Sequence, residues 1–205
     1  DSAYYQQLNT GLSRPFYNKA TQERTAPGST YKMVSSVAGL TEGVIDGGTI
    51  INCSGVFTEV TPSPRCWISP GAHGGLDVVG ALSNSCNVFY YTVGYDLGID
   101  SDGNYDSDLG IQKLAEYARM FGLGETSGVE IPESDPQISD EYAVQSAIGQ
   151  GTNNYTVSQL NRYVAAVANS GTVYSLTLID RTTDSNGKLI SDNEAEVVNT
   201  MDNIS

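Results

Sequence analysis

Basic residues are scarce in this chain of 205 residues, which has ten Lys and Arg against 24 Asp and Glu. The formal charge of −14 repels phosphate backbones, so we expect no nucleic-acid partner. The sequence also lacks the run of roughly 20 apolar residues that spans a bilayer. Its first residues do not follow the basic-then-apolar pattern of a signal peptide. Any membrane anchor is therefore expected outside this chain.

Charged residues make up only 17% of the chain, whereas glycine is frequent at 22 residues and hydrophobic residues make up 39%. This length and composition are sufficient for one domain with a buried core and too small for two. The sequence therefore indicates an ordered, polar and glycine-rich globular chain rather than a disordered acidic one.

Hydrophobic periodicity predicts mainly helices, with strands near the C-terminal end. Residues 44–75 are rich in Gly and Pro and are expected to form a long loop with short strands, a kind of segment that is usually functional. Residues 1–28 and 98–110 are expected to be irregular. Helices are predicted over residues 33–40, 76–82, 88–97 and 112–121, the last with Leu114, Tyr117, Ala118 and Phe121 facing inward.

The C-terminal third contains the clearest signals for element boundaries. Thr156 and Gln159 have the spacing of a capping box, and the helix that they open has Val157, Leu160, Val164 and Val167 on one stripe. A strand is predicted over residues 173–179, and the Asn-Gly pair in residues 185–188 predicts a hairpin turn.

Residues 29–32 form a Ser-x-x-Lys unit at the start of a predicted helix. Residues three apart lie on one helix face, so we expect the Lys32 amine to reach the Ser29 hydroxyl and activate it for acyl transfer. A helix N-terminus also offers unpaired N–H groups to a developing oxyanion. The alternative is that Ser29 is an ordinary N-cap. Residues 185–188 also fit Ser-x-x-Lys, but their Asn-Gly pair indicates a turn.

Ser85 and Asn87 form a Ser-x-Asn unit on a loop between two predicted helices. The Ser85 hydroxyl can relay a proton to a leaving group, while the Asn87 amide can bind a substrate carbonyl and hold the Lys32 side chain. The alternative is ordinary capping of the loop. Residues 191–193 also fit the pattern but lie in a polar stretch outside the helical body.

Together these motifs resemble the transpeptidase domain of class B penicillin-binding proteins. The resemblance extends over about residues 14–180, and its motifs follow one another in the family's order. It is carried by Arg24 with residues 26–32, by His73-Gly74 ahead of residues 81–89, and by residues 148–151 followed by Thr156 and Gln159.

The resemblance implies an α+β fold of the penicillin-binding and serine-lactamase type. It implies that Ser29 is the acylated nucleophile, that Lys32 is its general base, and that Ser85 and Asn87 line the site. The acyl donor would be a peptidoglycan stem peptide ending in D-Ala-D-Ala, which β-lactams mimic. The implied setting is the extracytoplasmic face of the bacterial cell membrane, with a membrane glycan polymerase as partner.

One family motif is absent, because no Lys is followed by Thr-Gly or Ser-Gly. In the family this third motif lies on a strand that binds the substrate carboxylate and forms one wall of the cleft. We therefore interpret residues 1–205 as an internal section of one transpeptidase domain, mainly its helical part, with flanking sheet strands missing. The isolated chain is expected to be a poor enzyme. A role in elongation, division or sporulation is left open.

Two other functions compete with the transpeptidase. A β-lactamase or β-lactam sensor shares the Ser-x-x-Lys chemistry, but a lactamase also needs a positioned base such as Glu, and no such motif is evident. A non-catalytic fragment or scaffold would explain the missing third motif.

All three cysteines and the only histidine fall within residues 53–86. Three thiolates and one imidazole form a complete tetrahedral set, so Cys53, Cys66, His73 and Cys86 predict a structural zinc site behind the second motif. Asp77 is a reserve ligand. Two alternatives are a Cys53–Cys66 disulfide and three free buried thiols.

Overall fold

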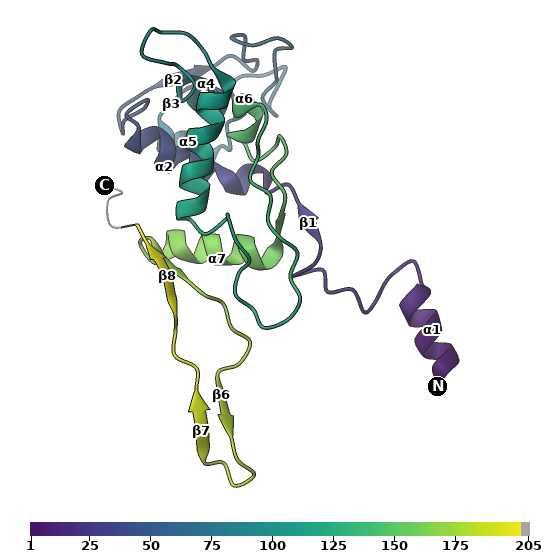
Figure 1. The fold of residues 1–205 in the computed structure, drawn as a ribbon. Coiled ribbons are helices and arrows are strands. Elements are labelled where there is room, and N and C mark those ends of the chain that lie inside the picture. Colours follow the sequence, from purple (N-terminus) through teal and green to yellow (C-terminus); the bar gives the residue numbers. More distant parts are fainter. Residues whose placement is uncertain (202–205) are drawn as a thin grey trace.

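The computed structural model describes residues 1–201 and shows a helical body with two extensions (Figure 1). Its helical elements are α1 (Ser2–Thr10), the 3-10 helix η1 (Gly28–Tyr31), α2 (Lys32–Thr41), α3 (Val78–Ser83), α4 (Asn87–Asp96), α5 (Ser107–Met120), α6 (Ala143–Ser146) and α7 (Val157–Ala168). Its strands are β1 (Arg24–Thr25), β2 (Ile51–Cys53), β3 (Gly74–Leu76), β4 (Tyr155–Thr156), β5 (Thr172–Tyr174), β6 (Arg181–Thr183), β7 (Leu189–Asp192) and β8 (Val197–Thr200).

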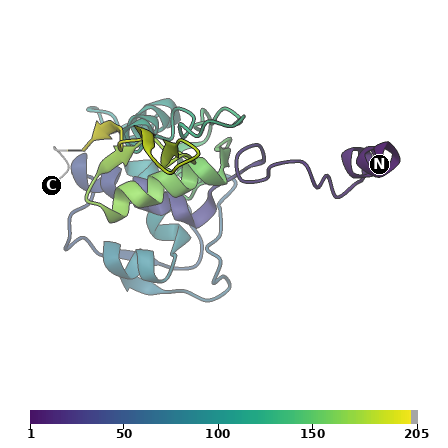
Figure 2. The same cartoon turned by 90° about the horizontal axis from the view of Figure 1, so that it is seen from below.

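The body is built from α2, α4, α5 and α6, which pack on one another, while α7 lies across one end (Figure 1). The two extensions are α1, which stands apart from the body at the N-terminus, and the β6–β7 hairpin (Figures 1 and 2). Helix α1 buries no side chain, and every residue of β6 and β7 is exposed. The site described below therefore lies outside both extensions.

The strands of residues 1–201 form four short antiparallel pairs, β1 with β4, β2 with β3, β5 with β8, and β6 with β7. Pairing of Arg24 with Thr156 and of Thr25 with Tyr155 ties the chain just before η1 to the start of α7. Pairing of Cys53 with Gly74 closes the long loop between α2 and α3.

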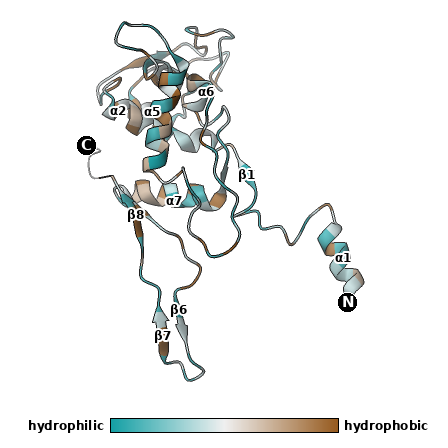
Figure 3. Cartoon of the chain, in the orientation of Figure 1, coloured by the Kyte–Doolittle hydropathy of each residue, from teal (hydrophilic) through white to brown (hydrophobic). Residues whose placement is uncertain are grey.

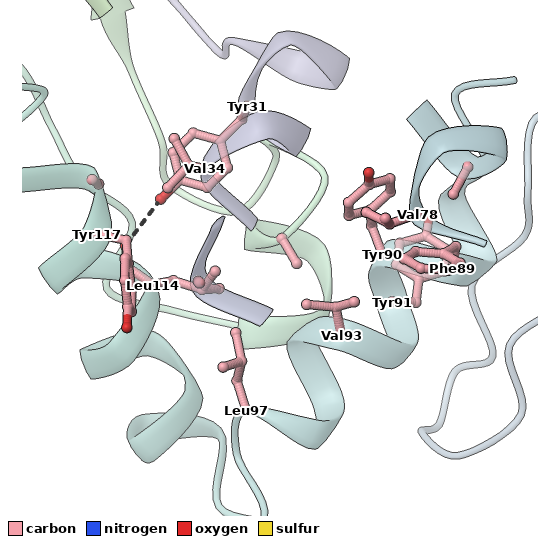
Figure 4. Packing of buried hydrophobic residues seen from close by; sticks show 14 of the residues in the cluster. Tyr31, Val34, Val78, Phe89, Tyr90, Tyr91, Val93, Leu97, Leu114 and Tyr117 are labelled. Atoms are coloured by element: carbon pink, nitrogen blue, oxygen red, sulfur yellow. Dashed lines mark hydrogen bonds between the residues drawn. The ribbon is translucent and has the colours of Figure 1, made fainter. Parts of the chain in front are cut away.

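The core lies between α2, α4 and α5, where aliphatic and aromatic side chains interdigitate (Figure 4). Val34 from α2, Phe89 and Val93 from α4, and Leu114 from α5 are all almost fully buried. The Tyr31 hydroxyl donates to the Leu114 carbonyl at 3.4 Å, which joins η1 to α5 (Figure 4). The end of η1 is thus anchored in the core while its beginning stays at the surface.

Several predicted elements are confirmed. The inward face predicted for residues 112–121 is buried, and the long loop contains only β2 and β3. The capping box is present in full, since the Thr156 side chain accepts from the Gln159 N–H and the Gln159 side chain accepts from the Thr156 N–H. The hairpin turn is also present, between β6 and β7.

Other predictions of local structure were wrong. Residues 2–10 form α1, and α5 begins at Ser107 inside the predicted loop because the Asp106 side chain caps it. The strand predicted over residues 173–179 is confined to β5.

The valine stripe of α7 faces away from the core. Val157, Val164 and Val167 are exposed, whereas the buried face includes Arg162 and Tyr163. Coloured by hydropathy, hydrophilic and hydrophobic residues alternate along the body and along the hairpin, without a continuous apolar segment (Figure 3). Across residues 1–201, no helix has both the length and the apolar composition needed to cross a membrane.

Candidate active site

The predicted nucleophile lies at the start of a helix, as the sequence indicates. Ser29 is the second residue of η1 and is exposed, while Lys32 begins α2 and is only 1% exposed. Gly28 precedes them with a φ of +56°, a conformation that glycine adopts without steric cost. The serine is therefore accessible to a substrate while the lysine amine is enclosed by protein.

The second motif lies on the turn between α3 and α4. Ser85 has a φ of +50°, which is uncommon for a residue other than glycine, and Asn87 is the first residue of α4. The connection between the two helices is thus a tight turn that brings the Ser85 side chain to Ser29 of η1 and the Asn87 side chain to Lys32 of α2.

Hydrogen bonds join the two motifs into one site. The Lys32 Nζ donates to the Ser85 carbonyl at 2.8 Å, to Ser85 Oγ at 3.0 Å and to Asn87 Oδ1 at 2.7 Å. Ser85 Oγ in turn donates to Ser29 Oγ at 2.8 Å. The structure therefore brings together all four residues that the sequence singled out for catalysis.

The path between the lysine and the nucleophile differs from the sequence prediction. We expected Lys32 to reach Ser29 directly, but its hydrogen bonds go to Ser85 and Asn87, and Ser85 stands between the two. The reason is the number of donors. An ammonium group has three N–H donors, and three oxygens of the second motif already accept all of them.

The pKa of Lys32 is well below its ordinary value. Burial disfavours the charged amine and lowers the pKa from 10.5 to about 8, against an opposing attraction from the thiols of Cys66 and Cys86. A minor fraction of the amine, about a tenth, is therefore neutral at pH 7, and this is the form that a general base requires.

A second part of the chain, residues 147–163, supports the nucleophile from behind. The Gly28 N–H donates to the Gly149 carbonyl at 3.0 Å, and the Tyr163 hydroxyl of α7 donates to the Thr30 carbonyl at 2.8 Å. A Cβ on Gly149 would lie 2.2 Å from the Gly28 carbonyl oxygen, so only glycine permits this approach. The role of Tyr163 was not predicted from the sequence, because this residue lies opposite the valine stripe.

The four predicted zinc ligands also lie together. The ligand atoms of Cys53, Cys66, His73 and Cys86 are all within 4.8 Å of one another. His73 Nδ1 is 3.5 Å from Cys53 Sγ and 3.7 Å from Cys66 Sγ. Zinc bond lengths of about 2.3 Å to sulfur and about 2.0 Å to nitrogen separate tetrahedral S and N ligands by about 3.6 Å. The donor set therefore fits zinc in both chemistry and spacing.

The surroundings of this cluster bear on the disulfide and on the reserve ligand, whereas free buried thiols stay an alternative to zinc. All three cysteines are free and buried, so the structure contains no Cys53–Cys66 disulfide. Asp77, the reserve ligand, instead caps α3 by accepting from the Gly80 N–H at 2.7 Å. Within residues 1–201, His73 Nε2 is buried and has no hydrogen-bond partner.

The cluster contacts the second motif directly. Cys66 Sγ accepts from the Asn87 N–H at 3.3 Å, and Cys86 lies between Ser85 and Asn87 as the N-cap residue of α4. Burial raises the pKa of the Cys66 thiol, but backbone N–H donors, including that of Asn87, outweigh burial and leave the pKa below its ordinary value. Burial raises the pKa of Cys86 to about 12.

Comparison with known proteins identifies the family of this chain. A family model described as "Penicillin binding protein transpeptidase domain" matches residues 2–203. The "Peptidoglycan D,D-transpeptidase MrdA" of Haemophilus influenzae is 30% identical over 187 residues, which are 82% of this chain and 27% of that protein. The protein of the same name from Acinetobacter baumannii is 28% identical over 184 residues, 82% of this chain and 25% of that protein.

A solved structure described as "Structural coordination of polymerization and crosslinking by a peptidoglycan synthase complex" superposes with a TM-score of 0.80. The identity is 27%, and the match covers 97% of this chain and 34% of that chain. The present chain thus spans about a quarter of the length of the curated relatives that it matches. The α+β fold and the resemblance to class B proteins are both confirmed, and the chain belongs to the penicillin-binding protein transpeptidase domain family.

Proposed function

We propose that this chain supplies the nucleophile and its activating groups to a peptidoglycan D,D-transpeptidase. The observation that carries the proposal is the continuous hydrogen-bonded path from Lys32 through Ser85 to Ser29. Such a path is what activation of a serine by a buried amine requires.

In the proposed reaction, Ser29 Oγ attacks the carbonyl carbon of the penultimate D-Ala of a stem peptide. The Ser29 proton moves to Ser85 Oγ, whose own proton moves to neutral Lys32, since both hydroxyls can rotate to reverse their hydrogen bonds. The protonated lysine returns this proton through Ser85 to the departing D-Ala amine. An acceptor amine then attacks the acyl-enzyme by the same steps in reverse.

β-Lactams would acylate the same serine, because they present a strained amide in place of the stem-peptide bond. A membrane glycan polymerase is the proposed partner, since polymerisation and cross-linking are coordinated in the synthase complex to which this chain is similar. The proposed setting is the extracytoplasmic face of the bacterial cell membrane, where the stem peptides are found.

We infer that residues 1–205 are an internal section of the domain and that the chain alone is a weak enzyme. The Lys-Thr/Ser-Gly motif is absent, so the site lacks a cation for the substrate carboxylate and one oxyanion donor. The exposed Val157, Val164 and Val167 of α7 support this inference, because further strands of the domain would cover such a stripe.

A fluorescent penicillin tests the proposal in the full-length protein. We expect a covalent adduct on Ser29, and none in Ser29→Ala at an unchanged melting temperature. An adduct on another residue, or none in the parent protein, would overturn the proposal. Rapid release of hydrolysed penicillin would instead favour a β-lactamase. Against that activity, the side-chain hydrogen bonds described for Ser29 and Lys32 reach no carboxylate.

We further propose a structural zinc ion held by Cys53, Cys66, His73 Nδ1 and Cys86. Bound there, zinc would cross-link the loop of residues 53–73 to the second motif and restrict its motion. The Asn87 N–H bond to Cys66 Sγ would then connect the metal site directly to the acylation site.

Metal analysis of the purified full-length protein tests the zinc site. We expect one zinc per chain in the parent and in Asp77→Asn, a matched control that keeps a side chain able to cap α3. We expect its loss in Cys66→Ser and in His73→Gln. Metal-free parent protein with a Cys53–Cys66 bridge in its peptide map would contradict the proposal.

A further inference from the structure

Ser85 occupies a backbone conformation that the rest of the turn must hold in place. The turn after α3 has the hydrogen bonds of a Schellman motif, from the Ser85 N–H to the Leu82 carbonyl at 3.0 Å and from the Cys86 N–H to the Ala81 carbonyl at 2.9 Å. Such turns usually place glycine where this chain has Ser85, at a φ of +50°. A strained residue at a functional site persists only where its surroundings fix it.

Two adjacent residues of the long loop hold the two ends of this turn. The Trp67 Nε1–H donates to the Asn84 carbonyl at 3.1 Å, and the neighbouring Cys66 Sγ accepts from the Asn87 N–H at 3.3 Å. The Asn84 carbonyl belongs to the peptide group that joins Asn84 to Ser85. The indole therefore constrains the peptide whose rotation would turn the Ser85 hydroxyl away from Ser29.

Trp67 is an unusual choice for an ordinary surface position. It is the only tryptophan of the chain, and it is 62% exposed. Its ring nevertheless packs edge-on against His73, with centroids 5.4 Å apart at an interplanar angle of 61°. The indole thus touches a proposed zinc ligand and donates its hydrogen bond to the turn of residues 84–87, here called the catalytic turn.

We propose that Trp67 is a positioning residue for acylation: its N–H fixes the Asn84–Ser85 peptide and thereby keeps Ser85 Oγ on the path between Lys32 and Ser29. This inference rests on the proposed function. It assigns Trp67 no contact with the substrate, so loss of the indole N–H should slow acylation without weakening the encounter with penicillin.

The test compares variants at position 67 in the full-length protein, using fluorescent penicillin and rapid mixing. The parent is measured first, because failure of the parent to acylate Ser29 would refute the proposed function itself. In Trp67→Phe the acylation rate constant should fall by about tenfold or more, because misplacement of a reacting group by about 1 Å can cost about a hundredfold in rate. The dissociation constant of the encounter complex should stay unchanged.

Two further measurements separate positioning from a general structural role. Zinc content and melting temperature should remain those of the parent in Trp67→Phe. Replacement of Trp67 by benzothienylalanine, which keeps the bicyclic shape and has sulfur in place of N–H, should slow acylation as much as Trp67→Phe. Tyr142→Phe, at a residue 61% exposed, is the control for an exposed aromatic side chain and should acylate like the parent.

Several outcomes would overturn the inference. Acylation by Trp67→Phe at the parent rate would remove any role for the residue. Parent-like acylation by the benzothienylalanine protein would assign the effect to ring packing rather than to the N–H. A weaker encounter complex at an unchanged acylation rate would make Trp67 a ligand contact instead, and loss of zinc or of thermal stability would make it a structural residue.

Discussion

Two parts of the molecule support the proposed acylation site, and they do so by different means. The helical support, residues 147–163, holds η1 with Ser29, here called the nucleophile turn, through backbone hydrogen bonds, strand pairing and the buried Tyr163 of α7. The loop support, residues 53–87, holds the second motif with little regular structure and a cluster of three cysteines and one histidine.

The two supports illustrate two ways of holding a short segment rigid, one by packing and one by the proposed metal ion. The helical support gains rigidity from packing, because its residues lie against α2 and η1. The loop support also buries side chains in the core, among them Phe57 and Val78, but it has little regular structure and many glycines and prolines. A metal ion that joins distant ligands would therefore stabilise it most. We therefore expect the two supports to respond differently to substitution, chelation and pH.

The largest expected effect is on the helical support. In Gly149→Ala a Cβ would lie 2.2 Å from the Gly28 carbonyl oxygen and 2.8 Å from Tyr31 Cβ, so the nucleophile turn must move. We expect a loss of about 3 kcal/mol or more in the free energy of unfolding, together with loss of penicillin acylation. Denaturant unfolding of the full-length protein measures the first effect.

Gly43→Ala is the matched control for Gly149→Ala. Gly43 has a similar φ of +70°, but a Cβ at this position would meet no atom within 4 Å. This variant should lose only the cost of a left-handed alanine, about 1–2 kcal/mol. Equal losses in the two variants would show that the close approach of Gly149 to Gly28 contributes nothing.

Chelation should separate the two supports. Removal of the proposed zinc from the full-length protein should lower the melting temperature and slow acylation, because Cys66, which accepts from the Asn87 N–H, would no longer be held by the metal. Hydrogen exchange should then increase in residues 53–87 and remain unchanged in residues 147–163. A uniform increase over both supports would contradict the idea that only the loop support depends on metal.

The pH dependence of acylation reports on the enclosed lysine. Lys32 must be neutral to accept a proton and has a pKa of about 8. The acylation rate should therefore rise by about tenfold per pH unit below this pKa and level off above it. An acylation rate that stays constant from well below this pKa to well above it would exclude Lys32 as the base.

The same shift affects stability. The folded-state pKa of Lys32 lies below the ordinary value of 10.5, so the folded chain binds fewer protons between about pH 8 and 10.5. The contribution of Lys32 to the free energy of unfolding is therefore least favourable below pH 8 and improves as the pH rises toward 10.5. Comparison with Lys32→Met across this range isolates the contribution.

The smallest expected effect is loss of one partly buried hydrogen bond in the helical support. Tyr163→Phe removes the 2.8 Å bond to the Thr30 carbonyl and should cost about 1–2 kcal/mol of unfolding free energy. Tyr31→Phe is a matched control, since Tyr31 is equally buried but its bond to Leu114 is longer, at 3.4 Å. A larger loss in Tyr31→Phe would contradict this ranking.

The four catalytic candidates and the four zinc candidates were identifiable in the sequence because each set has a distinctive chemical composition. Sequence patterns also predicted a helix over residues 33–40, close to the observed α2, from periodicity, and the start of α7 at Val157 from its capping box. The burial of Arg162 and Tyr163 was not predictable, because it depends on which neighbours α7 meets and not on its own pattern.

The sequence by itself thus determined the family, the reactive groups and the existence of most helices, since these depend on residue type and on spacing along the chain. Only the tertiary structure decided that Ser85 stands between Lys32 and Ser29, and that Trp67 and Cys66 hold the two ends of the catalytic turn. The physical reason is that these contacts join residues 17 to 56 positions apart. Their geometry depends on how the core packs α2 against α4, which no local pattern records.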